Sequence, residues 1–198
     1  MRKVIVSEWM TLDGVAQAPM SPGEDPDGGF RHGGWHVPHA GDAAFQQRVA
    51  ETVGAAGAYI LGRRTYETFA AFWPSAPREQ AVLADPLNER PKYVASSTLS
   101  EPLAWQHSTL LRGDVAKAVA ALKREEGGDL LVIGSTRLVR TLIERDLVDE
   151  LRLIIDPVLA GGGKRVFHDD GVLRRLRLTH SEVTATGSLI LTYVPATG

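Results

Sequence analysis

The chain has 198 residues, a formal net charge of −2, 43% hydrophobic residues and no cysteine. This composition is typical of a globular protein with a buried core, and it excludes disulfides, thiolate metal sites and cysteine nucleophiles. No stretch concentrates Lys and Arg, so we expect neither nucleic acid nor a membrane as a partner. The amino terminus lacks the apolar run of a signal peptide, and a cytoplasmic location is expected.

A strand is predicted from Val4 to about Met10, and the Asp13-Gly14 pair predicts a turn after it. The next stretch, residues 16–41, is rich in proline and glycine and shows no hydrophobic period. Loops of this length are uncommon in compact domains and are usually functional or disordered. Because disordered segments are poor in aromatic residues, Phe30 and Trp35 favour a functional loop.

Strands and helices alternate through the middle of the chain. Strands are predicted at residues 58–61, 91–95, 105–111, 130–133 and 151–155, and helices after Asp42, over Thr65 to Trp73, after Asp114 and after Thr136. The alternation of Leu176 with Leu178, and of Leu189 with Leu191 and Tyr193, predicts an antiparallel pair. Residues 1–198 therefore predict one α/β domain, with a mostly parallel sheet, helices on both faces and an antiparallel C-terminal edge.

Three predicted strands end in small or cationic residues. These ends read Gly62-Arg63-Arg64-Thr65, Ser96-Ser97-Thr98 and Gly134-Ser135-Thr136. Ligands of open α/β sheets bind beyond the carboxyl ends of strands, where helix starts offer unpaired N–H groups to phosphates. A phosphorylated dinucleotide fits these residues, although the Gly-x-Gly-x-x-Gly fingerprint is absent. The alternative interpretation is that they are turn glycines beside solvated arginines.

These segments also carry a resemblance to a known family. The relevant motifs, in order, are Asp13-Gly14, Gly62-Arg63-Arg64-Thr65-Tyr66-Glu67, residues 92–97, Val132-Ile133-Gly134-Ser135-Thr136, residues 147–151 and residues 161–167. The chain resembles the dihydrofolate reductase superfamily, and more closely the reductase domain of the bifunctional riboflavin-biosynthesis deaminase-reductase. The resemblance implies a dihydrofolate-reductase-like fold and NADPH as cofactor.

The resemblance also implies positions for the cofactor and the substrate. Residues assigned to NADPH are Leu12 and Gly14 at the nicotinamide, Gly62, Arg63, Arg64 and Thr65 at the adenosine-side phosphates, Ser96 and Ser97 at the 2′-phosphate, and Gly134, Ser135, Thr136, Leu138 and Val139 at the pyrophosphate. Trp9, Trp35, Tyr66 and Phe69 are candidates for stacking on a flat heterocyclic substrate. The helical spacing of Tyr66 and Phe69 favours a place in the core instead.

Two departures from folate reductases concern the pyrophosphate turn and the proton donor. Gly134-Ser135 stands where those enzymes have two glycines, and Trp35-His36-Val37-Pro38 is followed by an acid, Asp42, about two positions late. Asp42 and Asp13 are the candidate catalytic residues, since a carboxyl group in an apolar pocket can supply a proton. Asp42 equally fits the cap of the helix that follows it.

Two further motifs have weaker functional interpretations. His32, His36 and His39 could ligate a metal, but the loop has no period that directs them to one point, and we expect no metal. Gly161-Gly162-Gly163-Lys164 lacks the full phosphate-loop pattern, so a hairpin turn is expected there.

The resulting hypothesis is a homodimeric, NADPH-dependent reductase of a small pterin-like or pyrimidine-like heterocycle. The resemblance makes 5-amino-6-(5-phosphoribosylamino)uracil reductase of riboflavin biosynthesis the nearest activity, with dihydrofolate or pterin reduction as the alternative. An NADPH-binding sensor without turnover and a purely structural domain are the non-enzymatic alternatives. A proton donor close to the nicotinamide would distinguish an enzyme from a sensor.

Overall fold

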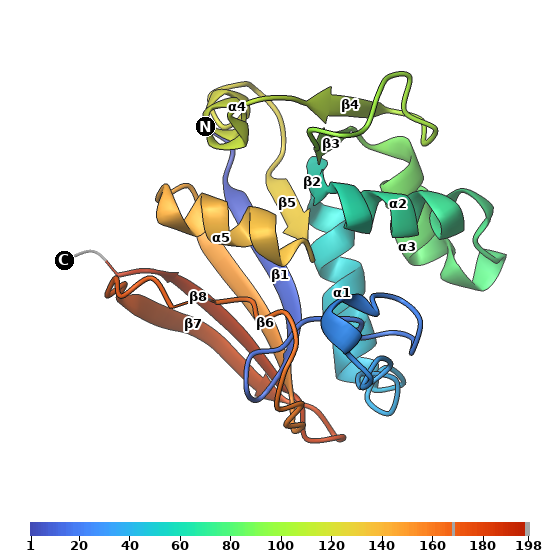
Figure 1. The fold of residues 1–198 in the computed structure, drawn as a ribbon, viewed down its shortest axis with the longest axis vertical. Coiled ribbons are helices and arrows are strands. Elements are labelled where there is room, and N and C mark those ends of the chain that lie inside the picture. The colour runs from blue at the N-terminus through green and yellow to red at the C-terminus, as the bar shows by residue number, and fades with distance from the viewer. Residues whose placement is uncertain (168, 197–198) are drawn as a thin grey trace. The chain divides into compact units, whose positions relative to one another are not determined.

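The computed structural model describes residues 1–167 and 169–196 and has an α/β architecture (Figure 1). The strands are β1 (Val4–Thr11), β2 (Ala58–Gly62), β3 (Lys92–Ala95), β4 (Ser108–Leu111), β5 (Leu130–Ile133), β6 (Glu150–Asp156), β7 (Leu176–Val183) and β8 (Leu189–Pro195). The helices are α1 (Ala43–Ala55), α2 (Arg63–Phe72), α3 (Ala81–Glu89), α4 (Val115–Leu122) and α5 (Thr136–Glu144). Short 3-10 turns lie at Asp27–Gly29, Trp73–Ser75 and Arg78–Gln80.

The strands are ordered β4-β3-β2-β5-β1-β6-β8-β7. β2 pairs in parallel with β3 and β5, β3 pairs in parallel with β4, and β8 pairs antiparallel with β6 and β7. The predicted fold class is therefore confirmed. The chain forms two compact units: residues 1–6 with 49–148, and residues 7–48 with 149–198.

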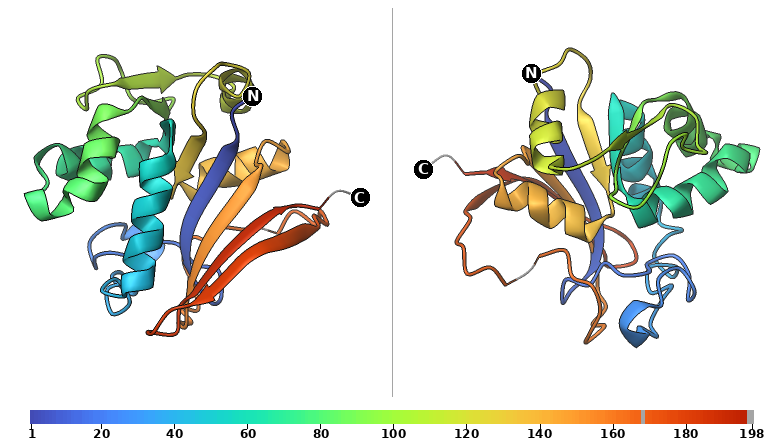
Figure 2. Two further views of the ribbon diagram at one scale, coloured as in Figure 1. Left: turned by 180° about the vertical axis from the view of Figure 1, so that it is seen from behind. Right: turned by 45° about the horizontal axis from the view of Figure 1, so that its top comes forward.

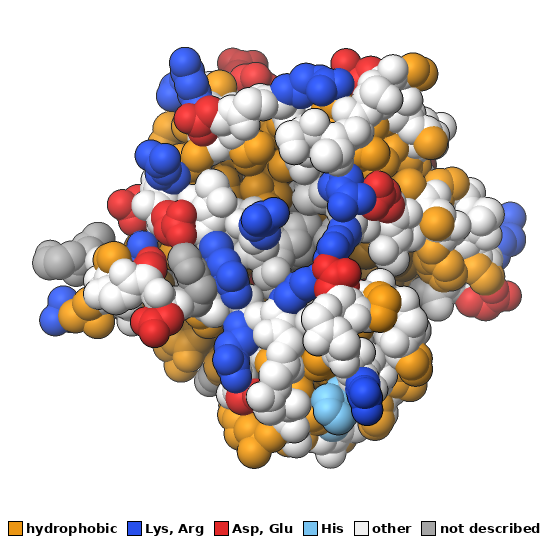
Figure 3. Space-filling view, in the orientation of Figure 1, with side chains coloured by type: hydrophobic (Ala, Val, Ile, Leu, Met, Phe, Trp, Pro, Cys, Tyr) orange, Lys and Arg blue, Asp and Glu red, His pale blue; other side chains and the backbone are white. Residues whose placement is uncertain are grey.

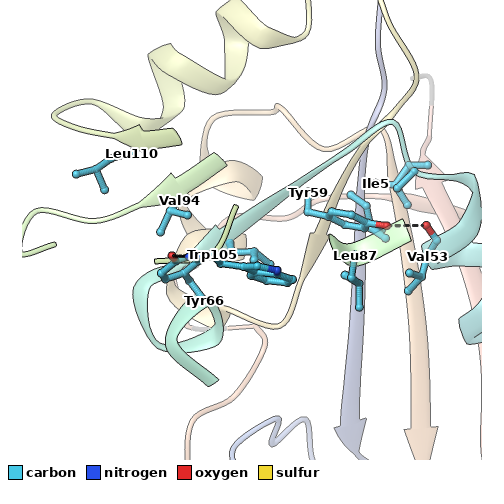
Figure 4. Packing of buried hydrophobic residues seen from close by; sticks show 11 residues of the cluster. Ile5, Val53, Tyr59, Tyr66, Leu87, Val94, Trp105 and Leu110 are labelled. Atoms are coloured by element: carbon cyan, nitrogen blue, oxygen red, sulfur yellow. Dashed lines mark hydrogen bonds between the residues drawn. The ribbon is translucent and has the colours of Figure 1, made fainter. Parts of the chain in front are cut away.

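The first unit contains the short parallel strands and an aromatic core. The buried runs of β2 and β5 suit strands that are covered on both faces. Tyr59, Tyr66 and Trp105 lie in the core cluster shown in Figure 4. The Tyr59 hydroxyl donates to the carbonyl of Val53 at 3.0 Å, and the Tyr66 hydroxyl accepts from the backbone N–H of Trp105 at 2.9 Å. The polar ends of both tyrosines are thus satisfied inside the core.

Helix α3 is an element that the sequence reasoning missed. Pro86 lies inside it, and proline in a helix interior removes a backbone hydrogen bond. A buried lysine caps the carboxyl end of the helix, where Lys92 Nζ donates to the carbonyls of Leu87, Asn88 and Arg90 at 2.8, 3.2 and 2.9 Å. Burial lowers the pKa of Lys92 to about 8, and its ammonium lies 4.4 Å from the centre of a Trp105 ring.

The second unit contains the long antiparallel strands, which lie side by side in Figures 1 and 2. The predicted pairing of the last two strands is confirmed, with Leu178 opposite Tyr193 and Val183 opposite Leu189. The hairpin expected at residues 161–164 is wrong, because β6 pairs with β8 rather than with β7. The chain between β6 and β7 is a long connection, and its glycines serve turns within it.

The length and hydropathy of the helices bear on membrane insertion. Among the residues that the structure describes, no helix is both long and apolar enough to cross a bilayer.

Candidate functional site

The predicted glycine, serine and arginine segments meet at one edge of the parallel sheet in the first unit. Tyr59 is opposite Leu131 in β5, and Gly62 is opposite Ala95 in β3. Since these strands are parallel, the residues after their carboxyl ends emerge at the same edge. The starts of α2 and α5 and the turn at Ser96 therefore lie beside one another.

Ser135 joins the starts of the two helices. Its hydroxyl accepts a hydrogen bond from the backbone N–H of Gly62 at 2.8 Å and donates to Thr65 Oγ1 at 2.8 Å. Both Gly134 (φ +56°) and Ser135 (φ +65°) have left-handed backbone conformations, which are unusual for serine. A side chain on Gly62 would contact Ser135 Oγ at 3.1 Å, so the two helix starts are packed closely.

The helix starts at this edge lack the aspartate caps of α1 and α4. Asp42 and Asp114 cap α1 and α4 by accepting backbone N–H bonds, whereas neither Gly62 nor Ser135 gives a side-chain cap to α2 or α5. An uncapped helix start presents unpaired N–H groups and the positive end of the helix dipole. Two such starts joined by one serine form a place where an extended anion fits.

Cationic side chains add to this positive potential. Arg63 pairs with Glu67 at 2.9 Å through an exposed contact, and Arg64 and Arg137 are exposed on the first turns of α2 and α5. Figure 3 shows Lys and Arg side chains gathered over α5 and the beginning of α2. An exposed ion pair contributes little to stability, so Arg63 can exchange Glu67 for a phosphate at small cost.

The remaining residues expected at the cofactor differ in their surroundings. Ser96 Oγ accepts from the N–H groups of Thr98 and Leu99 at 3.1 and 3.0 Å, while Ser97 is exposed. Leu138 and Val139 are buried in the core, so their side chains do not present a surface to a ligand. The segment as a whole fits a dinucleotide with phosphate groups through its backbone, hydroxyl and guanidinium donors.

The turn after β1, in the second unit, holds Asp13 as an ionised carboxylate. Asp13 accepts hydrogen bonds from Thr11 Oγ1 at 2.6 Å and from the backbone N–H groups of Ala160 and Gly161 at 3.0 and 2.9 Å. The Thr11 bond is the largest cause that lowers the pKa of Asp13, which lies at about 2. Its neighbours Leu12 and Gly14 are exposed and half-buried, and Gly14 has a φ of +81°.

Asp42 is occupied as a helix cap. Its carboxylate accepts from the N–H groups of Ala44 and Phe45 at 2.9 and 3.2 Å, and also from those of Ala185 and Thr186. Burial raises the pKa of Asp42, but these four bonds outweigh burial and hold it below its ordinary value. The cap interpretation is thus observed directly, and a catalytic role of Asp42 remains a prediction.

The four aromatic candidates separate into two groups. Tyr66 and Phe69 pack in or against the core cluster of the first unit, as their helical spacing favours. In the second unit, Trp35 is buried and its Nε1 donates to the carbonyl of Gln17 at 2.8 Å. Trp9 is half-buried, and its ring lies 4.8 Å from that of His36. Of the four aromatic candidates, Trp9 is the one that is both partly exposed and outside the core cluster of the first unit.

The proline- and glycine-rich loop forms one wall of a groove in the second unit. The groove encloses about 810 Å³ and is lined by Gln17 and residues 27–32 and 160–164. Lys164 fixes its two walls, since its Nζ pairs with the carboxylates of Asp25 and Asp27 and its backbone N–H donates to Gln17 Oε1 at 2.9 Å. The loop is therefore ordered by side-chain bonds rather than by regular structure.

The three loop histidines do not converge. His36 is fully buried, and its Nδ1 lies 2.7 Å from Asp156 Oδ2, while Ser188 Oγ donates to the other carboxylate oxygen at 2.7 Å. His32 is exposed beside Phe30, and the described residues contain no group of three potential ligands arranged for a metal ion. The His36–Asp156 pair anchors the loop and was missed, because the two residues are far apart in sequence.

The sequence reasoning also missed a buried acid, Glu8 on β1. Its side chain is 2% exposed, and its Oε1 has no hydrogen-bond partner among the described residues. The available clue was a glutamate inside a strand whose same-face neighbours, Val6 and Met10, are apolar.

The chain is similar to known proteins over nearly its whole length. A family model described as the RibD C-terminal domain matches residues 2–190. The chain belongs to the RibD C-terminal domain family. A curated relative, the uncharacterized protein YyaP of Bacillus subtilis, is 25% identical over 97% of this chain and 94% of its own length.

Solved structures with the same fold include other reductase-like proteins. A riboflavin biosynthesis protein of Shewanella sp. PV-4 superposes with a TM-score of 0.70 and 20% identity, over 98% of this chain and 99% of that one. Dihydrofolate reductase of Enterococcus faecalis, in complex with NADP(H), superposes with a TM-score of 0.63 and 16% identity, over 98% of this chain and 97% of that one. The deaminase/5-amino-6-(5-phosphoribosylamino)uracil reductase of Thermotoga maritima superposes with a TM-score of 0.63 and 13% identity, over 98% of this chain and 57% of that one. At these identities the comparison shows a shared fold between the RibD C-terminal domain and dihydrofolate reductase.

Proposed function

We propose that this protein is an NADPH-dependent reductase of a small pyrimidine-like or pterin-like heterocycle. The observation that carries the proposal is the pair of uncapped helix starts joined by Ser135 and flanked by Arg63 and Arg64. Such a pair offers backbone N–H groups, hydroxyls and guanidinium groups to several phosphates at once. A plain structural domain has no use for this concentration of donors.

The relatives support a choice of cofactor and substrate. The Enterococcus enzyme of the same fold is complexed with NADP(H), and the Thermotoga protein is named for reduction of 5-amino-6-(5-phosphoribosylamino)uracil. We therefore propose this uracil derivative as the first substrate to test, with dihydrofolate as the second. Both reductions add a hydride and a proton to a C=N or C=O bond.

Different residues are proposed to bind different parts of the cofactor and the substrate. Bound NADPH supplies the hydride, and the protein orients it against the substrate. Arg63, Arg64 and Thr65 hold the adenosine-side phosphates, Ser96 and Ser97 lie at the 2′-phosphate, and residues 134–136 hold the pyrophosphate. The family resemblance implies that Leu12, Asp13 and Gly14 would border the nicotinamide, and the loop of residues 16–41 would serve as a wall or lid over the substrate.

The decisive experiment is a titration of the purified protein with NADPH and with NADH, followed by cofactor fluorescence and calorimetry. We expect micromolar binding of NADPH and clearly weaker binding of NADH, because NADH lacks the 2′-phosphate. Oxidation of NADPH with either substrate then identifies an enzyme. Tight NADPH binding without turnover of any pterin or pyrimidine would favour the sensor. Absence of NADPH binding would contradict both the reductase and the sensor.

We also propose that the protein is a homodimer joined through β7. This edge strand exposes Leu176, Leu178 and Val183 at 42%, 47% and 68%. All three lie on the sheet face that carries the half-buried Tyr193 and Leu191. Exposed apolar edge strands are normally covered by another element. In a symmetric dimer, each chain covers the β7 edge of the other. Leu178→Glu is expected to give a monomer in light scattering, whereas a monomeric wild type would contradict the proposal.

A further inference from the structure

The groove in the second unit has no part in the cofactor binding proposed above, yet it has the dimensions of a ligand site. Its volume of about 810 Å³ lies in the range of pockets that hold small molecules. Every residue that lines the groove belongs to the second unit, so its form does not depend on the first unit.

A buried glutamine ties the two walls of the groove together. Gln17 is 4% exposed, and its Nε2 donates to the carbonyls of Asp25 and Asp27 at 2.9 and 3.0 Å. Its Oε1 accepts from the backbone N–H of Lys164 on the opposite wall at 2.9 Å. Because both walls are bonded to one buried side chain, the groove is formed in the chain alone, as binding sites for small molecules usually are.

The charged groups of the groove are unequally paired. The carboxylates of Asp25 and Asp27 lie 2.5 and 3.0 Å from the Lys164 ammonium. Arg31 has neither an ion pair nor a hydrogen bond among the described residues, and the backbone N–H groups of residues 162–163 have no acceptor among them. The groove thus presents a guanidinium and backbone donors while its carboxylates are engaged, which suits a ligand rich in acceptor oxygens.

Aromatic side chains lie on the same wall as this arginine. Phe30 and His32 both line the groove, and their rings meet edge to face with centroids 5.8 Å apart. Phe30 is half-buried and His32 is exposed, so each ring keeps surface that a ligand can reach. Aromatic rings with reachable surface favour packing against another flat ring.

From these observations we infer that the groove binds a small compound that carries a phosphate monoester and a flat ring. The guanidinium of Arg31 pairs with the phosphate, because its donors match phosphate oxygens. The N–H groups of residues 162–163 add donors, as successive backbone N–H groups in turns do at anion sites. The flat ring packs on Phe30 and His32, and Lys164 offsets the carboxylates that would repel the phosphate.

The test is a calorimetric titration of the protein with uridine 5′-monophosphate and with uridine. We expect saturable binding of the monophosphate, and at least about tenfold weaker binding of uridine, which lacks the charged hydrogen bonds. Arg31→Ala should weaken binding of the monophosphate by at least about tenfold for the same reason. The control is Arg175→Ala, at an exposed arginine outside the groove lining, which should change the affinity less than about twofold because salt screens distant charges. Absence of binding, equal binding of uridine, or equal losses from the two variants would overturn the inference.

Amide chemical shifts of the labelled protein locate the bound monophosphate. We expect the largest changes at Phe30 and residues 162–163, whether or not NADPH is present. Changes at residues 62–65 and 134–136 that NADPH abolishes would instead place the phosphate at the proposed cofactor site, and would overturn the inference while the reductase stands. Changes in the groove of a protein that fails to bind NADPH would support the inference and overturn the reductase.

Turnover distinguishes two sources of such a ligand, and this arm alone rests on the proposed function. A higher KM for 5-amino-6-(5-phosphoribosylamino)uracil in Arg31→Ala, at unchanged kcat, would identify the groove ligand as the substrate of the reductase. Unchanged kinetics in Arg31→Ala, together with its weaker binding of the monophosphate, would identify a second ligand that is separate from the substrate.

Discussion

The two compact units satisfy their polar groups in different ways. At the edge of the parallel strands, the starts of α2 and α5 have no side-chain cap, and the Ser135 hydroxyl links them. In the second unit, several polar side chains pair across long stretches of sequence, as in His36 with Asp156 and Lys164 with Asp25 and Asp27. A region that leaves donors available is suited to bind a ligand, whereas a region that pairs them holds an irregular chain in place.

The largest expected effect tests the pairing in the second unit. His36→Leu leaves the buried Asp156 carboxyl without its histidine, and breaking a buried pair costs about 3–5 kcal/mol. Urea unfolding should show this loss. His32→Leu, at an exposed histidine of the same loop, should change the free energy of unfolding by less than about 0.5 kcal/mol. Equal effects of the two changes would show that the buried pair does not anchor the loop.

Glu8 in the second unit has no hydrogen-bond partner for its buried Oε1 among the described residues, and it predicts a pH dependence. Its folded pKa of about 8 exceeds the ordinary value of 4.5, so between these values the folded protein holds a proton that the unfolded chain releases. The free energy of unfolding therefore falls as pH rises through this window, by at most ~1.4 kcal/mol per unit. Thermal melts from pH 5 to 9 should slope less in Glu8→Gln. Parallel curves would mean that Glu8 is ionised in the folded state.

The third prediction concerns the two arginines at the start of α2 in the first unit. Arg63→Ala with Arg64→Ala should weaken NADPH binding at least tenfold and NADH binding little, since a charged hydrogen bond contributes roughly 1.5–3 kcal/mol. Calorimetric titration measures both. Glu67→Gln is the control, because it frees Arg63 from its ion pair without removing a cation. Equal losses for the two cofactors would show that the arginines do not read the 2′-phosphate.

The smallest effect is expected at the surface of the groove. Lys164→Met removes partly exposed ion pairs with Asp25 and Asp27, and such pairs contribute about 0–1 kcal/mol. Global stability should therefore change little. Limited proteolysis within residues 16–41 should become faster, because the loop loses its ion pairs with the Lys164 ammonium. Unchanged cleavage would show that these ion pairs do not hold the loop.

The same contrast explains what the sequence could reveal. Short-range patterns predicted the strands of the first unit and its helices other than α3. They also predicted the segments that meet at its edge, because parallel strands bring successive carboxyl ends together. Helix α3 was missed because Pro86 interrupts its pattern, and because the bonds from Lys92 to its carboxyl end form only in the folded chain. The antiparallel partner of β6 was equally hidden, since a long connection separates it in sequence.

Individual side chains of the candidate site were harder to assign. The sequence offered Asp42 as a cap or an acid, and only the N–H groups of residues 185 and 186 show how fully its carboxylate is used. Glu8 was overlooked because no local pattern reports the absence of a partner. Burial and pairing depend on residues far away in sequence, so the ionisation of an acid follows from the fold rather than from its neighbours.

The hydroxyl of Ser135 has a consequence for how a long ligand is held. Because the hydroxyl hydrogen-bonds to both Gly62 and Thr65, a conformational change at the start of α5 should shift the start of α2. Two fragments of the dinucleotide, one carrying the 2′-phosphoadenosine and one carrying the nicotinamide and pyrophosphate, should therefore help each other to bind. By reciprocity, each fragment raises the affinity of the other by the same factor. Replacing Ser135 with glycine, which accepts the same backbone conformation, would leave two independent half-sites.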